Sequence, residues 1–166
     1  MVDKEEIRLL LKKNFVMSGE VKIHDDGVVD IVHAAELANI RFLRQWKKLP
    51  VTFGRIEGTF AVGEDAVETL EGFPRWVAKD LFSSGLPRLK TLDHAPDYIG
   101  QGWLLGPYKP DMPLLRTLNA HQAIMVVGEP DEVNTILNRY RGQGKKGAIP
   151  CATQLIRAGF GGNAKW

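Results

Sequence analysis

The sequence has little cysteine, no long apolar run and no recognisable leader, and each absence excludes a class of protein. The single Cys151 cannot form an internal disulfide, which fits a reducing compartment. No apolar run approaches the roughly 20 residues needed to cross a bilayer. The first residues, Met1-Val-Asp-Lys-Glu-Glu6, are acidic instead of basic and then apolar, so they do not resemble a secretory signal. We therefore expect a cytoplasmic protein without membrane contacts.

The sequence also lacks the common motifs of catalysis. It contains neither a Gly-x-x-x-x-Gly-Lys-Ser/Thr phosphate loop nor a His-Glu-x-x-His metal pair. Its histidines, 24, 33, 94 and 121, are scattered and form no close pair that would indicate a metal site. Cys151 has cations nearby, but a lone small cysteine on a short helix is typical of packing. We expect no enzymatic activity, no metal and no cofactor.

Acidic residues are absent from the C-terminal part of the chain. All 20 of them lie in residues 1–132, whereas residues 133–166 contain six cations. The formal charge is therefore +6 for 133–166 and 16 − 20 = −4 for the remainder of the chain. Such an asymmetry is typical of a segment that binds an acidic partner, above all a nucleic acid.

A degraded phrase recurs between residues 49 and 128. Each copy has an apolar residue, two further residues, a leucine, a turn-like step and an apolar or aromatic pair, as in 67–77, 89–99 and 115–125. Thr69, Thr91 and Thr117 mark spacings of 22 and 26. Such periods indicate stacked units, each too small to bury its own apolar face. We predict an α+β fold with a β core of short strands from irregular 22–26-residue repeats, flanked by an N-terminal helix and two C-terminal helices. The alternative is an ordinary β domain with chance similarity among its turns.

Capping residues and periodicity outline the elements around the repeats. Asp3 and Glu6 form a capping box before a helix over 4–14, and Asp25-Asp26-Gly27 predicts a hairpin between 21–23 and 28–32. After the repeats we expect a helix that Asp131 caps, a basic loop over 142–147, a helix over 148–158 and a final stretch that is not rigid. We divide the chain into a body, 1–138, and a basic, glycine-rich C-terminal segment, 139–166.

The C-terminal segment interleaves cations with aromatic rings. A protein that binds single strands without sequence preference needs cations along the phosphates and rings on which bases stack. No helix-turn-helix or zinc module is present, which favours single strands over duplex readout. The predicted contacts are Arg139, Tyr140, Arg141, Lys145, Lys146, Arg157, Phe160, Lys165 and Trp166. We expect the Trp166 ring, which follows Gly161 and Gly162, to have few core neighbours. In the alternative interpretation, Tyr140 and Phe160 cover the core and the cations are merely solvated.

A second basic cluster precedes the repeats. If residues 34–48 form a helix, three of its cations share one face. The predicted accessory contacts with nucleic acid are Arg41, Arg44, Trp46, Lys47 and Lys48. The alternative is a solvated helix face that its aromatic residues anchor to the core.

Two segments carry a resemblance to known proteins. Leu70-Glu-Gly-Phe-Pro74-Arg-Trp-Val77 and Leu92-Asp-His-Ala-Pro96-Asp-Tyr-Ile99 resemble the degenerate Leu-x-x-Leu-x-Gly-x-Pro-x-x-Val arrays of phage-encoded repeat proteins. The size, β core and basic end are also similar in plan to Drc-type phage proteins, which are single-stranded DNA-binding cofactors of the phage RNA polymerase. This resemblance implies single-stranded DNA and phage RNA polymerase as partners in the cytoplasm of an infected bacterium. RNA as the strand, a role in replication and a homo-oligomeric state stay open.

A different class of function is also compatible with the repeats. A repeat scaffold binds other proteins, for example as a phage inhibitor of a host protein. Its binding surface would be aromatic and would comprise Trp76, Tyr98, Trp103 and Tyr108.

Overall fold

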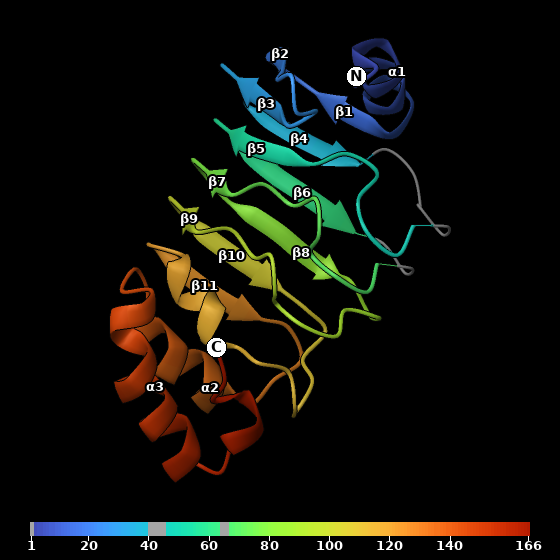
Figure 1. Cartoon of the computed structure of the whole chain (residues 1–166). Helices are drawn as coiled ribbons and strands as arrows, with labels where there is room; N and C mark the ends of the chain where they lie inside the picture. The colour runs from blue at the N-terminus through green and yellow to red at the C-terminus, as the bar shows by residue number, and fades with distance from the viewer. Residues whose placement is uncertain (1, 40–45, 64–66) are drawn as a thin grey trace.

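The computed structural model describes residues 2–39, 46–63 and 67–166, and the chain winds into a β-solenoid with two sheets (Figure 1). Sheet A contains, in spatial order, β1 (Phe15–Met17), β4 (Glu36–Asn39), β6 (Thr59–Gly63), β8 (Leu81–Gly85), β10 (Gly102–Leu105) and β11 (Ala123–Val126). Sheet B contains β2 (Glu20–Ile23), β3 (Val29–Val32), β5 (Phe53–Ile56), β7 (Trp76–Val77) and β9 (Tyr98–Ile99). The predicted α+β repeat architecture is confirmed.

The structural repeat is shorter and more regular than the spacing of the recurring sequence phrase. Phe60, Leu81, Trp103 and Ile124 are register partners in sheet A and follow one another at nearly equal intervals, one solenoid turn each. All four side chains are buried. Neighbouring turns pair in parallel, and the antiparallel pairs β1–β4 and β2–β3 occur where the chain enters the solenoid. Each turn thus buries its apolar face against the next turn, as expected for units that are unstable alone.

The third copy of the phrase departs from its predicted alignment. A 3-10 helix, η1 (Leu115–Asn119), replaces the turn, and Ala120 pairs with Ile99 of sheet B. Ile124 therefore belongs to sheet A beside Trp103, and its predicted equivalence with the Tyr98–Ile99 pair is wrong. His94 and His121 lie in different local structures, because His94 occupies a turn with φ 66° and His121 follows η1.

Aromatic and leucine side chains fill the space between the sheets. The rings of Phe15, Phe53, Phe60 and Phe73 form a chain with successive centroids 5.4 Å apart. Trp103 is only 1% exposed, and its Nε1 donates a hydrogen bond to Ser83 Oγ at 2.8 Å. The core is therefore continuous along the solenoid and satisfies its buried indole N–H internally.

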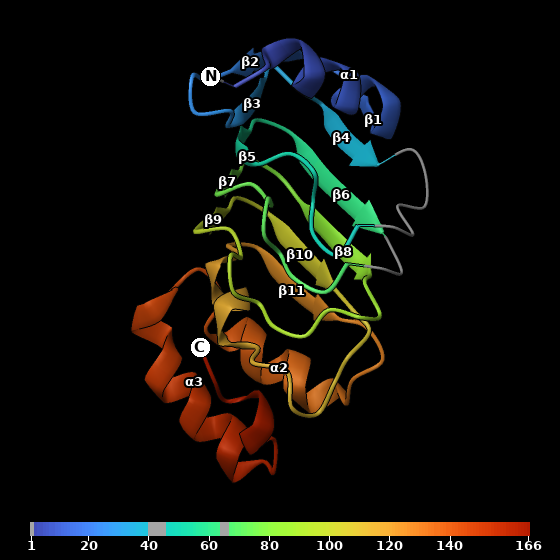
Figure 2. The same cartoon turned by 45° about the vertical axis from the view of Figure 1, so that its right-hand side comes forward.

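Helices cover both ends of the solenoid (Figure 2). At the N-terminal end, α1 (Lys4–Asn14) starts as predicted, because the Asp3 carboxylate accepts from the N–H groups of Glu5 and Glu6. The predicted hairpin is confirmed as β2–β3. At the other end lie α2 (Asp131–Arg139) and α3 (Lys145–Arg157). Covered ends keep the outer strands of such a stack from pairing with other chains.

Four local expectations are wrong. Asp131, expected to cap α2, is its first residue, and the N-cap is Pro130. The helix expected within 34–48 is absent from its described part, where residues 36–39 form β4 and residues 47–48 are bent. Residues 145–147, expected in a loop, begin α3. The final stretch, expected not to be rigid, contains the 3-10 helix η2 (Gly161–Asn163), in which the Asn163 side chain is fully buried. In the described ranges, no helix is both long and apolar enough to cross a membrane.

Candidate nucleic-acid interface

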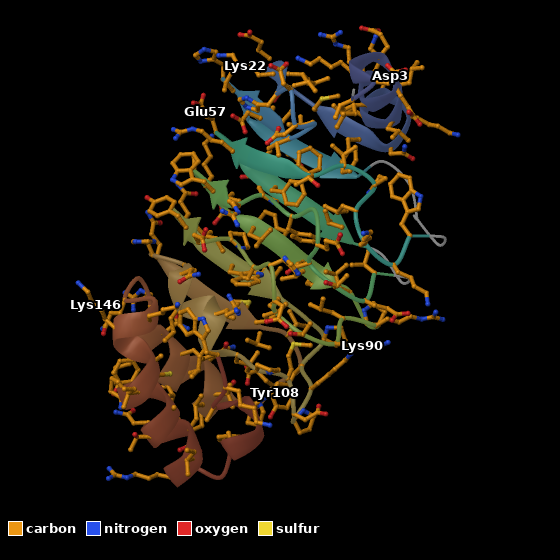
Figure 3. All side chains as sticks on the ribbon, viewed as in Figure 1. Asp3, Lys22, Glu57, Lys90, Tyr108 and Lys146 are labelled. Carbon is orange, nitrogen blue, oxygen red and sulfur yellow. The ribbon has the colours of Figure 1, made fainter. Side chains whose placement is uncertain are left out.

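The candidate interface lies on the C-terminal cap, which we define as residues 131–166. Its helices bury one apolar face each against the last turn, with Val133, Ile136 and Leu137 from α2 and Cys151 and Leu155 from α3. The polar faces consequently point away from the core. All six cations of the cap are exposed: Arg139, Arg141, Lys145, Lys146, Arg157 and Lys165. Figure 3 shows Lys146 at the start of α3, directed away from the solenoid.

No acidic side chain neutralises these cations within the described part of the chain. Arg139 Nη1 donates to the amide oxygen of Gln154 at 2.5 Å, and Arg141 Nη1 donates to the backbone carbonyl of Asn138 at 2.6 Å. Both acceptors are uncharged, so the guanidinium groups are oriented but keep their full charge. The cap therefore presents a positive surface to any anion.

Three lysines of the solenoid, in contrast, form ion pairs with glutamates. Lys47 Nζ lies 3.7 Å from Glu68, which also pairs with Lys90 from the next turn. The pKa of the Glu68 carboxyl is lowered, mainly by the hydrogen bond from the Lys90 ammonium. Desolvation of the carboxyl partly opposes this shift. Lys48 Nζ lies 2.5 Å from Glu71. These cations are engaged between turns, in contrast to those of the cap.

The start of α3 concentrates positive charge where a helix already has a positive end. Its N-cap is Gly144, with φ 51° and no side-chain capping bond, and no acidic residue lies in its first turn. Lys145 and Lys146 instead occupy this turn. Cations at a helix N-terminus oppose the macrodipole by up to about 1 kcal/mol each at an exposed site. The placement thus does not serve helix stability, and it strengthens the local positive potential.

The predicted rings of the cap are partly buried. Tyr140, Phe160 and Trp166 all pack against the hydrophobic core. The Trp166 ring lies between two cations, with Arg116 Cζ 5.7 Å and Lys145 Nζ 6.0 Å from its centroid. The expectation that this C-terminal ring has few core neighbours is wrong, because Asn163 anchors the end of the chain. Its side chain binds the carbonyls of Lys109 and Met112 and the Tyr108 hydroxyl.

A shallow groove of about 320 Å³ runs between the two cap helices. Arg139 and Arg157 line it from α2 and α3, and Ile136 contributes an apolar part of its wall. The carboxylate of Glu132 also lines the groove, so a phosphate of a crossing strand would be held by the two arginines beside one acidic side chain. The other cations, around Lys145 and Trp166, lie at the opposite end of α3, so the predicted contacts fall into two groups.

The second basic cluster has a weaker structural basis. Arg41 and Arg44 lie outside the described residues. Trp46 is half-buried, and Lys47 and Lys48 are paired with acids of the following turn. The described part of this cluster therefore carries little free positive charge.

Sheet B carries a stack of side chains that sequence reasoning missed. The Arg55 guanidinium carbon lies 3.7 Å from the Trp76 ring centroid, and the Trp76 and Tyr98 rings stack at 5.4 Å with an interplanar angle of 8°. The His121 ring lies next to Tyr98, with centroids 4.6 Å apart and an interplanar angle of 44°. The available signal was that Arg55, Trp76 and Tyr98 follow one another in the sequence at nearly the repeat period. Because the rings cover one another's faces, this stack stabilises neighbouring turns more than it offers faces to bases.

The aromatic surface proposed for a protein-binding scaffold does not form as one patch. Trp76 and Tyr98 belong to the stack on sheet B, whereas Trp103 is buried between the sheets. Tyr108 is half-buried, and burial raises the pKa of its hydroxyl. The four residues were predicted together only because their sequence positions could not reveal which way each ring points.

The remaining chemistry of the described residues gives no sign of a catalytic centre. Cys151 is buried, and burial raises the pKa of its thiol to about 11, which disfavours the nucleophilic thiolate. No three of the His, Cys, Asp and Glu side chains within 2–39, 46–63 and 67–166 are grouped so that they could hold a metal ion.

A second groove, of about 630 Å³, lies along the turn corners. Charges of both signs line it, including Glu71, Asp93, Arg75 and Arg116.

Fold and site together define a class, a β-solenoid with a basic helical cap. No protein-family model matches the chain, and neither the curated proteins nor the solved structures yield a match.

Proposed function

We propose that this protein binds single-stranded nucleic acid through its C-terminal cap, without sequence preference. The observation that carries the proposal is the set of six exposed cap cations that have no acidic partner among the described residues. Cations that are already oriented and unneutralised gain the most from phosphate, because no existing ion pair must be broken.

The rings of the cap supply the second requirement. Trp166 retains some exposure near Lys145, so a base that reaches it meets a ring and an unpaired cation together, whereas the nearby Arg116 already pairs with Asp93 at 3.4 Å. Single-stranded DNA is the preferred ligand and RNA the alternative. The finer role, as a phage RNA polymerase cofactor or replication factor, is proposed from the sequence resemblance alone.

Fluorescence anisotropy with labelled single-stranded and double-stranded oligonucleotides tests the proposal. If four to six cap cations contact phosphate, the log–log salt slope on single strands should be about −3 to −4, at roughly −0.7 per contact. Replacing both Lys145 and Lys146 by alanine should make this slope shallower by up to about 1.4. The loss should be similar for every base composition.

Lys47 and Lys48 form the matched control, because their double alanine variant removes the same formal charge from a paired site. We expect a smaller change in both affinity and slope from this variant. Circular dichroism of each variant checks that it is folded. The proposal is wrong if the wild type binds no single strand at low salt, or if the cap variant binds like the wild type.

A further inference from the structure

The outer face of sheet A is crossed by an apolar row. Val16, Ala61, Phe82, Leu104 and Met125 occupy the same register line in β1, β6, β8, β10 and β11. Val16 is 60% exposed, Phe82 41% and Met125 57%. A water-facing sheet position is normally polar, so an apolar row over these five strands indicates a covered surface.

The corresponding line on sheet B shows the contrast within the same molecule. It contains Lys22, Asp30, Arg55, Trp76 and Tyr98. Charged or amphipathic side chains thus face solvent on one sheet, while the other presents none along its central row. The difference concerns two faces of one solenoid and does not follow from overall composition.

The row is graded in size. From the N-terminal to the C-terminal end of the solenoid it reads Val16, Ala61, Phe82, Leu104 and Met125, so the smaller side chains precede the three large ones of the last three strands. We infer that this face binds a second copy of the chain, in a symmetric dimer whose two-fold axis runs along the strands between β6 and β8.

This axis pairs large positions with smaller ones. It sets Phe82 opposite Ala61 of the second copy and Met125 opposite Val16, and it places Leu104 over β4. Facing layers of side chains pack best when large residues meet small ones. A two-fold axis along the solenoid would instead set Phe82 against Phe82 and alanine against alanine, leaving clashes and voids side by side.

Charge favours the same arrangement. Running the two solenoids in opposite directions places the basic caps, +6 each over residues 133–166, at opposite ends of the dimer. Asp80, beside the row, already accepts a hydrogen bond from the Gly102 N–H at 2.8 Å and would face Thr59 of the second copy. In the described strands, no carboxylate beside the row then opposes another carboxylate.

The size of the face sets the strength of the contact. Five strand spacings of about 4.8 Å and strands of four to five residues give a footprint of roughly 24 Å by 15 Å. Both copies together then bury on the order of 800 Å², below the roughly 1,200 Å² of stable complexes. The dimer should be weak and concentration-dependent, and α1 and the cap should prevent further end-to-end stacking.

Sedimentation velocity over about 10 μM to 1 mM, a range suited to weak complexes, measures the equilibrium. The wild type should shift from monomer to dimer, and Phe82→Glu should remain monomeric throughout. Ile149→Glu on α3 is the matched control, since it removes an apolar side chain that is 80% exposed elsewhere, and it should dimerise like the wild type. A wild type that is monomeric at the highest concentration, or equal effects of both variants, overturns the proposal.

Cross-linking tests the geometry and does not depend on the glutamate variant. A mixture of the Val16→Cys and Met125→Cys variants should form a mixed disulfide, whereas Met125→Cys alone should not link to itself across roughly 24 Å. The native Cys151 is buried and does not compete. Self-linking of Met125→Cys without the mixed product would show that the solenoids run in the same direction and would refute the proposed axis.

Discussion

Asn163 fastens the end of the chain, and its replacement by alanine is the sharpest test of how the cap is held. The side chain is fully buried and makes three hydrogen bonds. Its Nδ2 donates to the carbonyl oxygens of Lys109 at 2.9 Å and Met112 at 3.0 Å, and its Oδ1 accepts from the Tyr108 hydroxyl at 2.8 Å. The three partners lie in a segment far earlier in the sequence, before η1, so these bonds close a long loop.

The expected loss of unfolding free energy depends on which polar groups the alanine variant leaves without a hydrogen-bond partner. Each neutral hydrogen bond contributes about 0.5–1.5 kcal/mol net, and a buried group without a partner costs about 1–3 kcal/mol. The half-buried Tyr108 hydroxyl can turn to water, whereas the Met112 carbonyl lies in a buried residue. We expect Asn163→Ala to lower the free energy of unfolding by roughly 2–4 kcal/mol, which corresponds to about 4–16 °C in a domain of this size.

Urea denaturation of matched variants measures this difference. Asn14→Ala is the control, because Asn14 is also buried but makes one side-chain bond, to the Leu10 carbonyl; its cost should be about 1 kcal/mol or less. Asn163→Asp keeps the shape of the side chain but directs a carboxylate at two carbonyl oxygens. Its loss of unfolding free energy relative to the wild type should therefore shrink at acidic pH, where the carboxylate becomes protonated. If Asn163→Ala costs no more than Asn14→Ala, the bonds do not hold the cap and the reasoning is refuted.

Two further predictions concern Trp166 and Glu129. Trp166→Ala should weaken single-strand binding by roughly 1–3 kcal/mol without changing the salt slope, since no charge is lost. It should also lower the melting temperature, because the ring packs on the core. Anisotropy at several salt concentrations and a thermal melt check both effects. A slope change as large as that of the Lys145 and Lys146 double variant would contradict a stacking role. Burial, and secondarily Asp131, raise the pKa of Glu129 above its ordinary 4.5, so the folded state favours the protonated carboxyl. The contribution of the protonated carboxyl to the free energy of unfolding is fully present below pH 4.5, and it is lost as the pH rises through the raised pKa of the folded state. Glu129→Gln, which mimics the neutral acid, should therefore gain melting temperature relative to the wild type as the pH rises from about 4 to about 7, and a difference independent of pH would exclude this titration.

Several features could be predicted because they depend on local sequence. Asp3 caps α1 through atoms two and three residues away, and Gly27 closes the β2–β3 hairpin with φ 86°. The repeat period was visible because each turn places an apolar residue at the same point of the coil. The acid-free end of the chain, and with it the positive cap, is a property of composition alone.

Only the tertiary structure decided which residues of different turns become neighbours. A strand exposes every second residue, so one step in register separates the buried Trp103 from the outward Leu104, and short apolar runs do not specify that step. Pairing between successive turns built the Arg55–Trp76–Tyr98 stack and the apolar row of sheet A. Trp166 likewise looked free beside Gly161 and Gly162, yet Asn163 bonds to a segment far away in the sequence and brings the ring onto the core. The sequence by itself determined the repeat and the charge of the cap, whereas long-range pairing determined which side chains are exposed for binding.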